Sequence, residues 1–184
     1  YSTKNASKLG YAVLFQFLQQ KTGVSAEKLQ NTFEKIVKVI KTEKNPAIRK
    51  REYTIQKLLH KYFINSPKIL AEALEVFWEV VGKNIQPASG LKKLVTDLKK
   101  NYTLVLASDE FQKPLILKLK AALGEFDVFE MIVTPEVTKT MKPSRIYYDK
   151  IIEELKFLPQ EMLMIGDSWE RDLAPAHLIG LKTI

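Results

Sequence analysis

The sequence MIGDSWERDL, residues 164–173, leads from an apolar run straight into Gly-Asp-Ser and places a second aspartate five residues after the first. The apolar run is typical of a buried strand, and the polar turn marks its end. If Asp167 and Asp172 both lay inside one helix, five steps of about 100° would leave them on different faces. They converge only if Asp167 precedes the helix and Asp172 lies in or just before its first turn. The two acids therefore either cap and solvate a turn or hold a cation.

Around this stretch, residues 87–184 alternate short apolar strands with amphipathic helices. Strands are predicted near residues 102–107, 131–133 and 162–165 and from Leu181 onward, and helices near residues 91–100, 113–123, 144–155 and 172–179. Such alternation with short connections is typical of an α/β fold, a parallel sheet with helices on its faces. In open sheets of this kind, ligands bind beyond the carboxyl ends of the strands.

That rule selects a small set of polar residues. Ser108 and Asp109 directly follow the predicted strand at residues 102–107, and Asp167 follows the one at residues 162–165. Lys142 comes before Pro143 in the loop TPEVTKTMKP, just ahead of a helix. We therefore expect a hydroxyl, a lysine and carboxylates to meet at one edge of the sheet.

Residues 1–86 have a different pattern, with apolar residues at helical spacing. The spacing predicts helices near residues 6–20, 29–40, 55–63 and 69–81. Asn45-Pro46 and Ser66-Pro67 each offer a capping side chain followed by proline at the first helical position. We therefore expect a small helical bundle over residues 1–86 and a separate α/β domain over residues 87–184.

The net positive charge of the chain comes entirely from its first half. Residues 1–86 hold 15 Lys or Arg against 7 Asp or Glu, whereas residues 87–184 hold 14 of each. Such a balance favours an anionic ligand, or else reflects a solvated lysine-rich surface. The aromatic residues of this half fall on apolar helix faces, so a platform for stacking nucleic-acid bases is not indicated. A small phosphorylated molecule is the partner that we expect, and the oligomeric state is left open.

Composition excludes several classes of protein. The chain has no cysteine, which excludes disulfides, thiolate metal sites and cysteine nucleophiles. No apolar run reaches the roughly 18 residues of a membrane span, and no signal-peptide pattern opens the chain. We expect a cytoplasmic protein without a membrane partner.

Together these motifs resemble the haloacid dehalogenase superfamily, in its helical-cap subgroup of phosphoglycolate phosphatase-like hydrolases. TLVLAS (residues 103–108) resembles the second motif of that family, KPSRIYY (residues 142–148) the third and MIGDSWERDL the fourth. The resemblance covers essentially the whole chain. It implies a three-layer, Rossmann-like core, truncated at its first strand, with an all-helical cap over residues 1–86.

The resemblance also implies a reaction, the magnesium-dependent hydrolysis of a phosphate monoester through an aspartyl-phosphate. Ser108 would donate a hydrogen bond to a phosphoryl oxygen, and Lys142 would balance the charge of nucleophile and phosphate. Asp167 would bind Mg²⁺ directly, and Asp172 would act through a coordinated water or orient Asp167 or Lys142. We therefore take Ser108, Lys142, Asp167 and Asp172 as candidate catalytic residues, with both aspartates at the metal.

Two positions depart from the family pattern. Asp109 lies among the candidate phosphate-binding residues with Ser108 and Lys142, but the family commonly has Asn there, and a second carboxylate would repel a phosphate. Its role is left open. The first motif of the family, a strand ending in Asp-x-Asp that supplies the nucleophile, has no counterpart in the chain, and Tyr1-Ser2-Thr3 resembles the segment just after it. We expect the nucleophile upstream of Tyr1 and the chain alone to be inactive.

Three alternatives stay open. A 2-haloacid dehalogenase uses the same aspartate nucleophile on carbon without a metal, and the pair Asp167 and Asp172 argues against it. A phosphomutase would transfer the phosphoryl group to a sugar rather than to water. A binding protein on a decayed hydrolase fold fits the absent nucleophile, but would not require Ser108, Lys142 and both aspartates.

Overall fold

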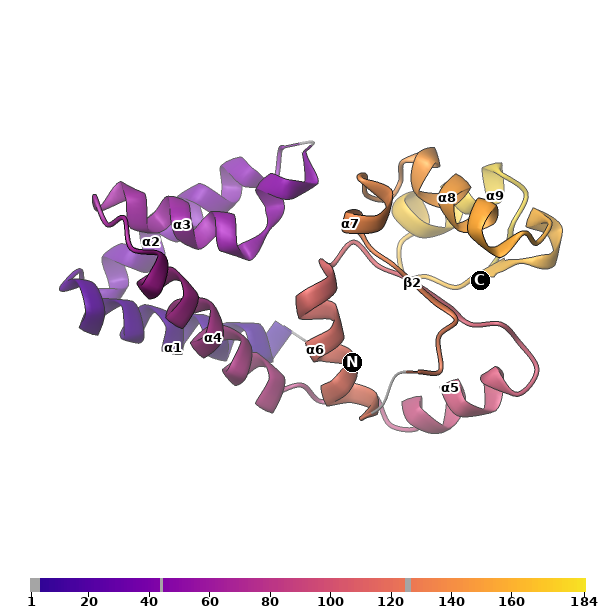
Figure 1. Cartoon of the computed structure of the whole chain (residues 1–184), viewed down its shortest axis with the longest axis horizontal. Coiled ribbons are helices and arrows are strands. Elements are labelled where there is room, and N and C mark those ends of the chain that lie inside the picture. The colour runs from indigo at the N-terminus through magenta and orange to yellow at the C-terminus, as the bar shows by residue number, and fades with distance from the viewer. Residues whose placement is uncertain (1–3, 44, 125–126) are drawn as a thin grey trace. The chain divides into compact units, whose positions relative to one another are not determined.

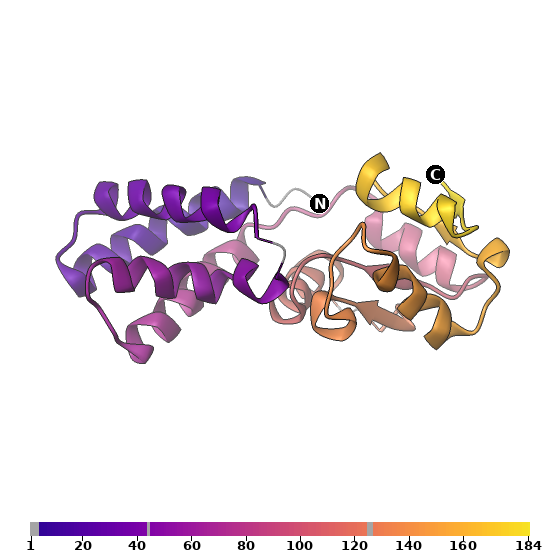
Figure 2. The same ribbon diagram turned by 90° about the horizontal axis from the view of Figure 1, so that it is seen from above.

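The helical spacing of the first half is confirmed. The computed structural model describes residues 4–43, 45–124 and 127–184. Tyr1-Ser2-Thr3, which resemble the segment after the first motif, lie outside the described residues. The helices of this half are α1 (Lys4–Thr22), α2 (Ala26–Ile40), α3 (Arg51–Lys61) and α4 (Pro67–Lys83). They lie side by side as a bundle (Figures 1 and 2).

Both predicted capping residues form their caps, but they start different kinds of helix. The Ser66 hydroxyl accepts a hydrogen bond from the Ile69 N–H at 3.2 Å, so Ser66 caps α4 as predicted. Asn45 also caps, because its side-chain oxygen accepts from the Ala47 N–H at 2.9 Å. The element that it starts is the short 3-10 helix η1 (Pro46–Arg49), and α3 begins only after it.

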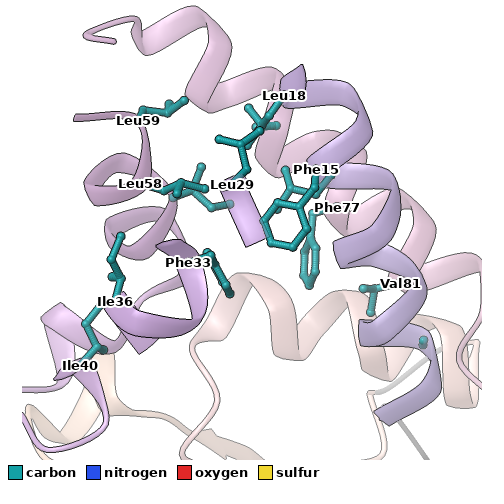
Figure 3. Packing of buried hydrophobic residues seen from close by; sticks show 14 of the residues in the cluster. Phe15, Leu18, Leu29, Phe33, Ile36, Ile40, Leu58, Leu59, Phe77 and Val81 are labelled. Carbon is teal, nitrogen blue, oxygen red and sulfur yellow. The ribbon is translucent and has the colours of Figure 1, made fainter. Parts of the chain in front are cut away.

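The core of the bundle is built from the apolar faces of these helices. Phe77 of α4 is fully buried, with its ring centroid 4.9 Å from that of Tyr11 and 4.8 Å from that of Trp78. A Cβ at Gly10 would come within 2.8 Å of Val81 Cγ2, so α1 and α4 approach closely because residue 10 has no side chain. Figure 3 shows Phe77 and Val81 within the same cluster as Phe15.

The second half contains every predicted strand and helix, and the first and third strands are shorter than predicted. The strands are β1 (Val105–Ala107), β2 (Met131–Val133), β3 (Leu163–Met164) and β4 (Lys182–Thr183). The longer helices are α5 (Leu91–Lys99), α6 (Gln112–Leu123) and α8 (Arg145–Leu155). The predicted last helix begins early, as the π-helical turn η3 (Trp169–Leu173), and continues as α9 (Ala174–Leu178).

Two short elements lie where the sequence predicted loops, α7 (Pro135–Thr138) and the 3-10 helix η2 (Pro159–Glu161). Each begins with a proline at its first position and spans only about one turn. A segment this short carries no periodic pattern, so sequence spacing does not reveal it.

The strands pair in parallel, as predicted, but as two separate ladders. Ala107 of β1 lies opposite Val133 of β2, and Met164 of β3 lies opposite Thr183 of β4. No ladder hydrogen bond joins the two pairs within the part of the chain that the structure describes. One edge of β1 and one edge of β3 therefore have no strand partner there.

The described chain forms two compact units. The first comprises residues 1–104 and 113–130 apart from the gaps given above, and the second comprises residues 105–112 and 131–184. The buried cluster of the helical bundle extends from Ala6 to Ile85, and the predicted domain boundary at residues 86 and 87 stays a prediction. No helix in the described ranges is long and apolar enough to cross a membrane.

The second unit has its own core beneath the strands, formed by Val133, Tyr147, Tyr148, Ile151, Ala176 and Leu181. Parallel strands, crossover helices and a separate helical bundle together make the predicted class, an α/β, Rossmann-like core with an all-helical cap. All the candidate site residues lie in the second unit.

Candidate active site

Lys142 and Asp172 form a buried ion pair at the carboxyl ends of β1 and β3. Lys142 Nζ lies 2.5 Å from Asp172 Oδ1, and the two side chains are only 10% and 7% exposed. Lys142 Nζ also donates to the Ala107 carbonyl at the end of β1, at 3.2 Å. Because desolvation offsets most of the attraction in a buried pair, such a pair adds little net stability. Its position at the strand ends is better explained by chemistry than by folding.

The backbone holds Asp172 in this position. Its second oxygen, Oδ2, accepts the Ser168 N–H at 3.2 Å. A Cβ at Gly166 would come within 2.5 Å of Asp172 Cβ, which is closer than side-chain atoms pack. Glycine at 166 is therefore needed for Asp172 to fold back over the end of β3.

Ser108 lies directly after β1, as predicted. Its hydroxyl oxygen accepts the Glu110 N–H at 3.0 Å, and its own N–H donates to the Val133 carbonyl at 2.9 Å. A hydroxyl that accepts one hydrogen bond still has its proton to donate. Ser108 is half-buried, so this proton remains within reach of a ligand.

Asp109 has both carboxylate oxygens engaged. Oδ1 accepts the Lys142 backbone N–H at 2.9 Å, and Oδ2 pairs with the Arg171 guanidinium. The Asp109 side chain is 11% exposed, whereas that of Arg171 is 54% exposed. The sequence suggested no role for Arg171, which stands beside Asp172 without any motif of its own. The predicted contact of Asp109 with phosphate stays a prediction.

Asp167, unlike Asp172, is exposed. It makes no hydrogen bond or ion pair with any residue that the structure describes. A free carboxylate at a strand end fits Mg²⁺, which takes one or two carboxylates and keeps several waters. Asp172 fits a supporting role, since its oxygens already bind Lys142 and Ser168. The described residues contain no group of three or more acidic, His or Cys side chains arranged for a metal.

Two buried tyrosines of α8 bind backbone carbonyls around the site, Tyr147 at the ends of β1 and β2 and Tyr148 in η3, and sequence analysis missed both. The Tyr147 hydroxyl lies 2.9 Å from the Ser108 carbonyl and 2.8 Å from the Val133 carbonyl. The Tyr148 hydroxyl donates to the Arg171 carbonyl and lies 3.4 Å from that of Asp172. Burial raises the pKa of both phenols above the usual range. The only sequence feature that could have indicated these residues is that two tyrosines stand side by side within a predicted helix.

Replacing Tyr147 with phenylalanine is expected to lower the free energy of unfolding of the second unit by about 1 kcal/mol at neutral pH. Because burial raises the pKa of Tyr147, the neutral phenol stabilises the fold fully below about pH 10, where a phenol in the unfolded chain ionises. This contribution is lost as the pH rises further. Urea denaturation at pH 8 and pH 10.5 should show a smaller alkaline loss in Tyr147→Phe than in the parent. Tyr102→Phe, at an exposed tyrosine, is the control, and an equal alkaline loss in Tyr147→Phe and the parent would contradict the prediction.

The chain matches a protein family over most of its length. The model of the haloacid dehalogenase-like hydrolases matches residues 22–184. A curated relative, the ribulose-1,5-bisphosphate 5-phosphatase of Halopiger xanaduensis, is 22% identical over 110 residues. That match covers 60% of this chain and 46% of the relative, so the chain spans about half the length of the curated relative that it matches.

Solved structures share the fold. The HAD-hydrolase YfnB of Bacillus subtilis, bound to magnesium, has a TM-score of 0.69 at 20% identity, over 99% of this chain and 81% of its own. For the 2-haloacid dehalogenase of Pseudomonas syringae the TM-score is 0.77 at 18% identity, over 100% and 80% of the two chains. For the HAD phosphatase of Thermococcus onnurineus it is 0.68 at 20% identity, over 99% and 79%. These likenesses show a shared fold, and because the family model matches residues 22–184, the chain belongs to the haloacid dehalogenase-like hydrolases.

Proposed function

We propose that this chain forms part of a magnesium-dependent phosphatase that hydrolyses a small phosphorylated metabolite through an aspartyl-phosphate. The observation that carries the proposal is the buried ion pair of Lys142 and Asp172 beside Ser108 at the strand ends. A lysine held by a carboxylate at this position suits the charge of a transferring phosphoryl group. The phosphatase among the relatives and the magnesium-bound YfnB support the same reaction class.

Each residue has a distinct part in this proposal. The Ser108 hydroxyl donates a hydrogen bond to a phosphoryl oxygen, because none of the described residues accepts its proton. The Lys142 ammonium group balances negative charge, while Asp172 holds it in place. Asp167 and, through water, Asp172 are the residues that would hold Mg²⁺. When bound, the ion supplies Lewis-acid stabilisation of the phosphoryl oxygens.

The nucleophile is assigned to an aspartate outside this chain, on a strand ending in Asp-x-Asp. β1 and β3 each have an edge without a strand partner among the described residues, where another strand could pair. Leu163 and Ile165, at and just beyond β3, are exposed apolar residues that such a strand could cover. A carboxylate nucleophile divides the displacement into two easier steps.

Substrate choice is assigned to the helical cap, residues 1–86. Its excess of positive charge favours a multiply anionic metabolite over a neutral one. The same proposal places the α/β core at residues 87–184 and the protein in the cytoplasm.

The test is hydrolysis of an aryl phosphate by two proteins, residues 1–184 alone and the same chain preceded by its upstream strand with Asp-x-Asp. We expect activity only in the longer protein, and only with Mg²⁺ present. Activity of residues 1–184 alone would overturn the assignment of the nucleophile. Release of halide from a 2-haloacid in the presence of a chelator would instead identify a dehalogenase.

In the longer protein, Asp167→Asn is expected to lower kcat/KM by about 100-fold or more, because a bound metal supplies several kcal/mol of transition-state stabilisation. Raising the Mg²⁺ concentration should restore part of the lost activity. Glu170→Gln, at an exposed acid three residues later in η3, is the matched control and should leave activity unchanged. Equal effects of the two substitutions would show that Asp167 does not hold the ion.

A further inference from the structure

The carboxylate of Asp109 lies at the junction of three separate stretches of the chain. It follows β1, its Oδ1 accepts the N–H of Lys142 just ahead of α8, and its Oδ2 pairs with Arg171 in η3. These stretches are 33 and 62 residues away in sequence from Asp109. One side chain therefore links the three loops that carry Ser108, Lys142 and Asp172.

Lys142 is held at both ends by carboxylates. Asp109 holds its backbone N–H at 2.9 Å, and Asp172 holds its ammonium group at 2.5 Å. A long flexible side chain reaches a fixed point only if its backbone is also fixed. Asp109 therefore helps to fix the position of the Lys142 ammonium group by holding the backbone of Lys142, without contacting the ammonium group itself.

Arg171 explains why this position holds an aspartate. A carboxylate offers an acceptor to both the Lys142 N–H and the guanidinium, whereas an asparagine has one acceptor oxygen and would turn its amide N–H groups toward one of these donors. The guanidinium also neutralises a carboxylate that would otherwise repel an anion at the strand ends. Where the family commonly has asparagine, this chain therefore has an aspartate, Asp109, that pairs with Arg171.

We infer that Asp109 is a positioning residue, which holds Lys142 through its backbone N–H and is itself neutralised by Arg171. In catalytic terms the inference rests on the proposed phosphatase function. The hydrogen bond to the Lys142 N–H does not depend on that function, so it is tested separately.

The catalytic test compares Asp109→Asn, Arg171→Gln and the double variant in the longer, active protein. Each single substitution is expected to lower kcat about 10- to 100-fold, as the loss of a supporting contact does, with KM changed less than about threefold. The double variant should be no slower than the slower single variant, because both changes break one linked pair. Loss in the double variant equal to the product of the single losses would overturn the inference. So would a lower KM in Asp109→Asn, which would place the carboxylate against the substrate phosphate.

The structural test is amide hydrogen exchange of Lys142, which needs no activity. Asp109→Ala should speed this exchange at least about tenfold, whereas Asp149→Ala, at the surface partner of Arg145 on α8, should leave it unchanged. Unchanged exchange in Asp109→Ala would overturn the inference even if the protein is an active phosphatase. Faster exchange in a protein without phosphatase activity would support the linkage and reject the proposed reaction.

Discussion

Lys142→Met is expected to lower the free energy of unfolding of the second unit by about 3–5 kcal/mol and the phosphatase activity of the longer protein by about 100-fold or more. Asp172 is 5% exposed, and without Lys142 its carboxylate would be a buried charge that pairs with no cation among the described residues. The cost of the substitution comes mainly from that stranded charge, since an intact buried pair contributes little net stability. Urea denaturation measures it, followed by fluorescence in a Trp78→Phe background, where Trp169 of the second unit is the only tryptophan left.

A double variant separates stability from catalysis. Adding Asp172→Asn to Lys142→Met replaces the buried charge with a neutral amide, so most of the lost stability should return while activity does not. Lys150→Met is the matched control, because Lys150 pairs with Glu154 at the exposed surface of α8 in the same unit and should cost less than about 1 kcal/mol. A loss in Lys142→Met no larger than in Lys150→Met would show that the pair is not desolvated.

Phe77→Ala is expected to lower the free energy of unfolding of the helical bundle by about 3–5 kcal/mol. Phe77 is fully buried, and its ring packs against Tyr11 and Trp78 and lies 4.8 Å from the Arg51 guanidinium carbon. Truncation removes these contacts and leaves a cavity between α1 and α4, which the helices fill only in part. The fluorescence of Trp78, next to the cavity, reports the unfolding of this unit.

The control for Phe77→Ala is a second phenylalanine with the opposite environment. Phe63 is 97% exposed and has a φ of 59°, so its replacement by alanine removes no buried area and leaves the backbone in the same conformation. Phe63→Ala should change the free energy of unfolding by less than about 0.5 kcal/mol. Similar losses in the two variants would contradict the packing seen around Phe77 (Figure 3).

Much of the fold was predictable from local pattern. Apolar spacing located the four long helices of the bundle, and short apolar runs located the four strands. β2 has its predicted bounds, whereas β1 and β3 are shorter than predicted, because a parallel ladder pairs only residues that face a partner strand. α7 was missed because a single turn shows no periodicity.

The candidate site was predictable only in part. The strand-end rule selected Ser108, Asp109, Lys142 and Asp167. It did not select Asp172, which the structure joins directly to Lys142. The same rule could not reveal Tyr147, whose hydroxyl reaches back from α8 to the ends of β1 and β2. Nor could it reveal the link between Asp109 and Arg171, because their 62-residue separation is closed only by the packing of the strands and α8.

The two acids of MIGDSWERDL separate what local sequence pattern predicts from what only the tertiary structure decides. By itself the sequence determined that Asp167 and Asp172 flank the start of a helix at the end of a strand, because strand and helix periods are local properties of the chain. Only the tertiary structure decided that Asp172 is buried against Lys142 while Asp167 is exposed. Burial and ion pairing depend on which distant loops the packed core brings to the same strand ends, and no local pattern encodes that choice.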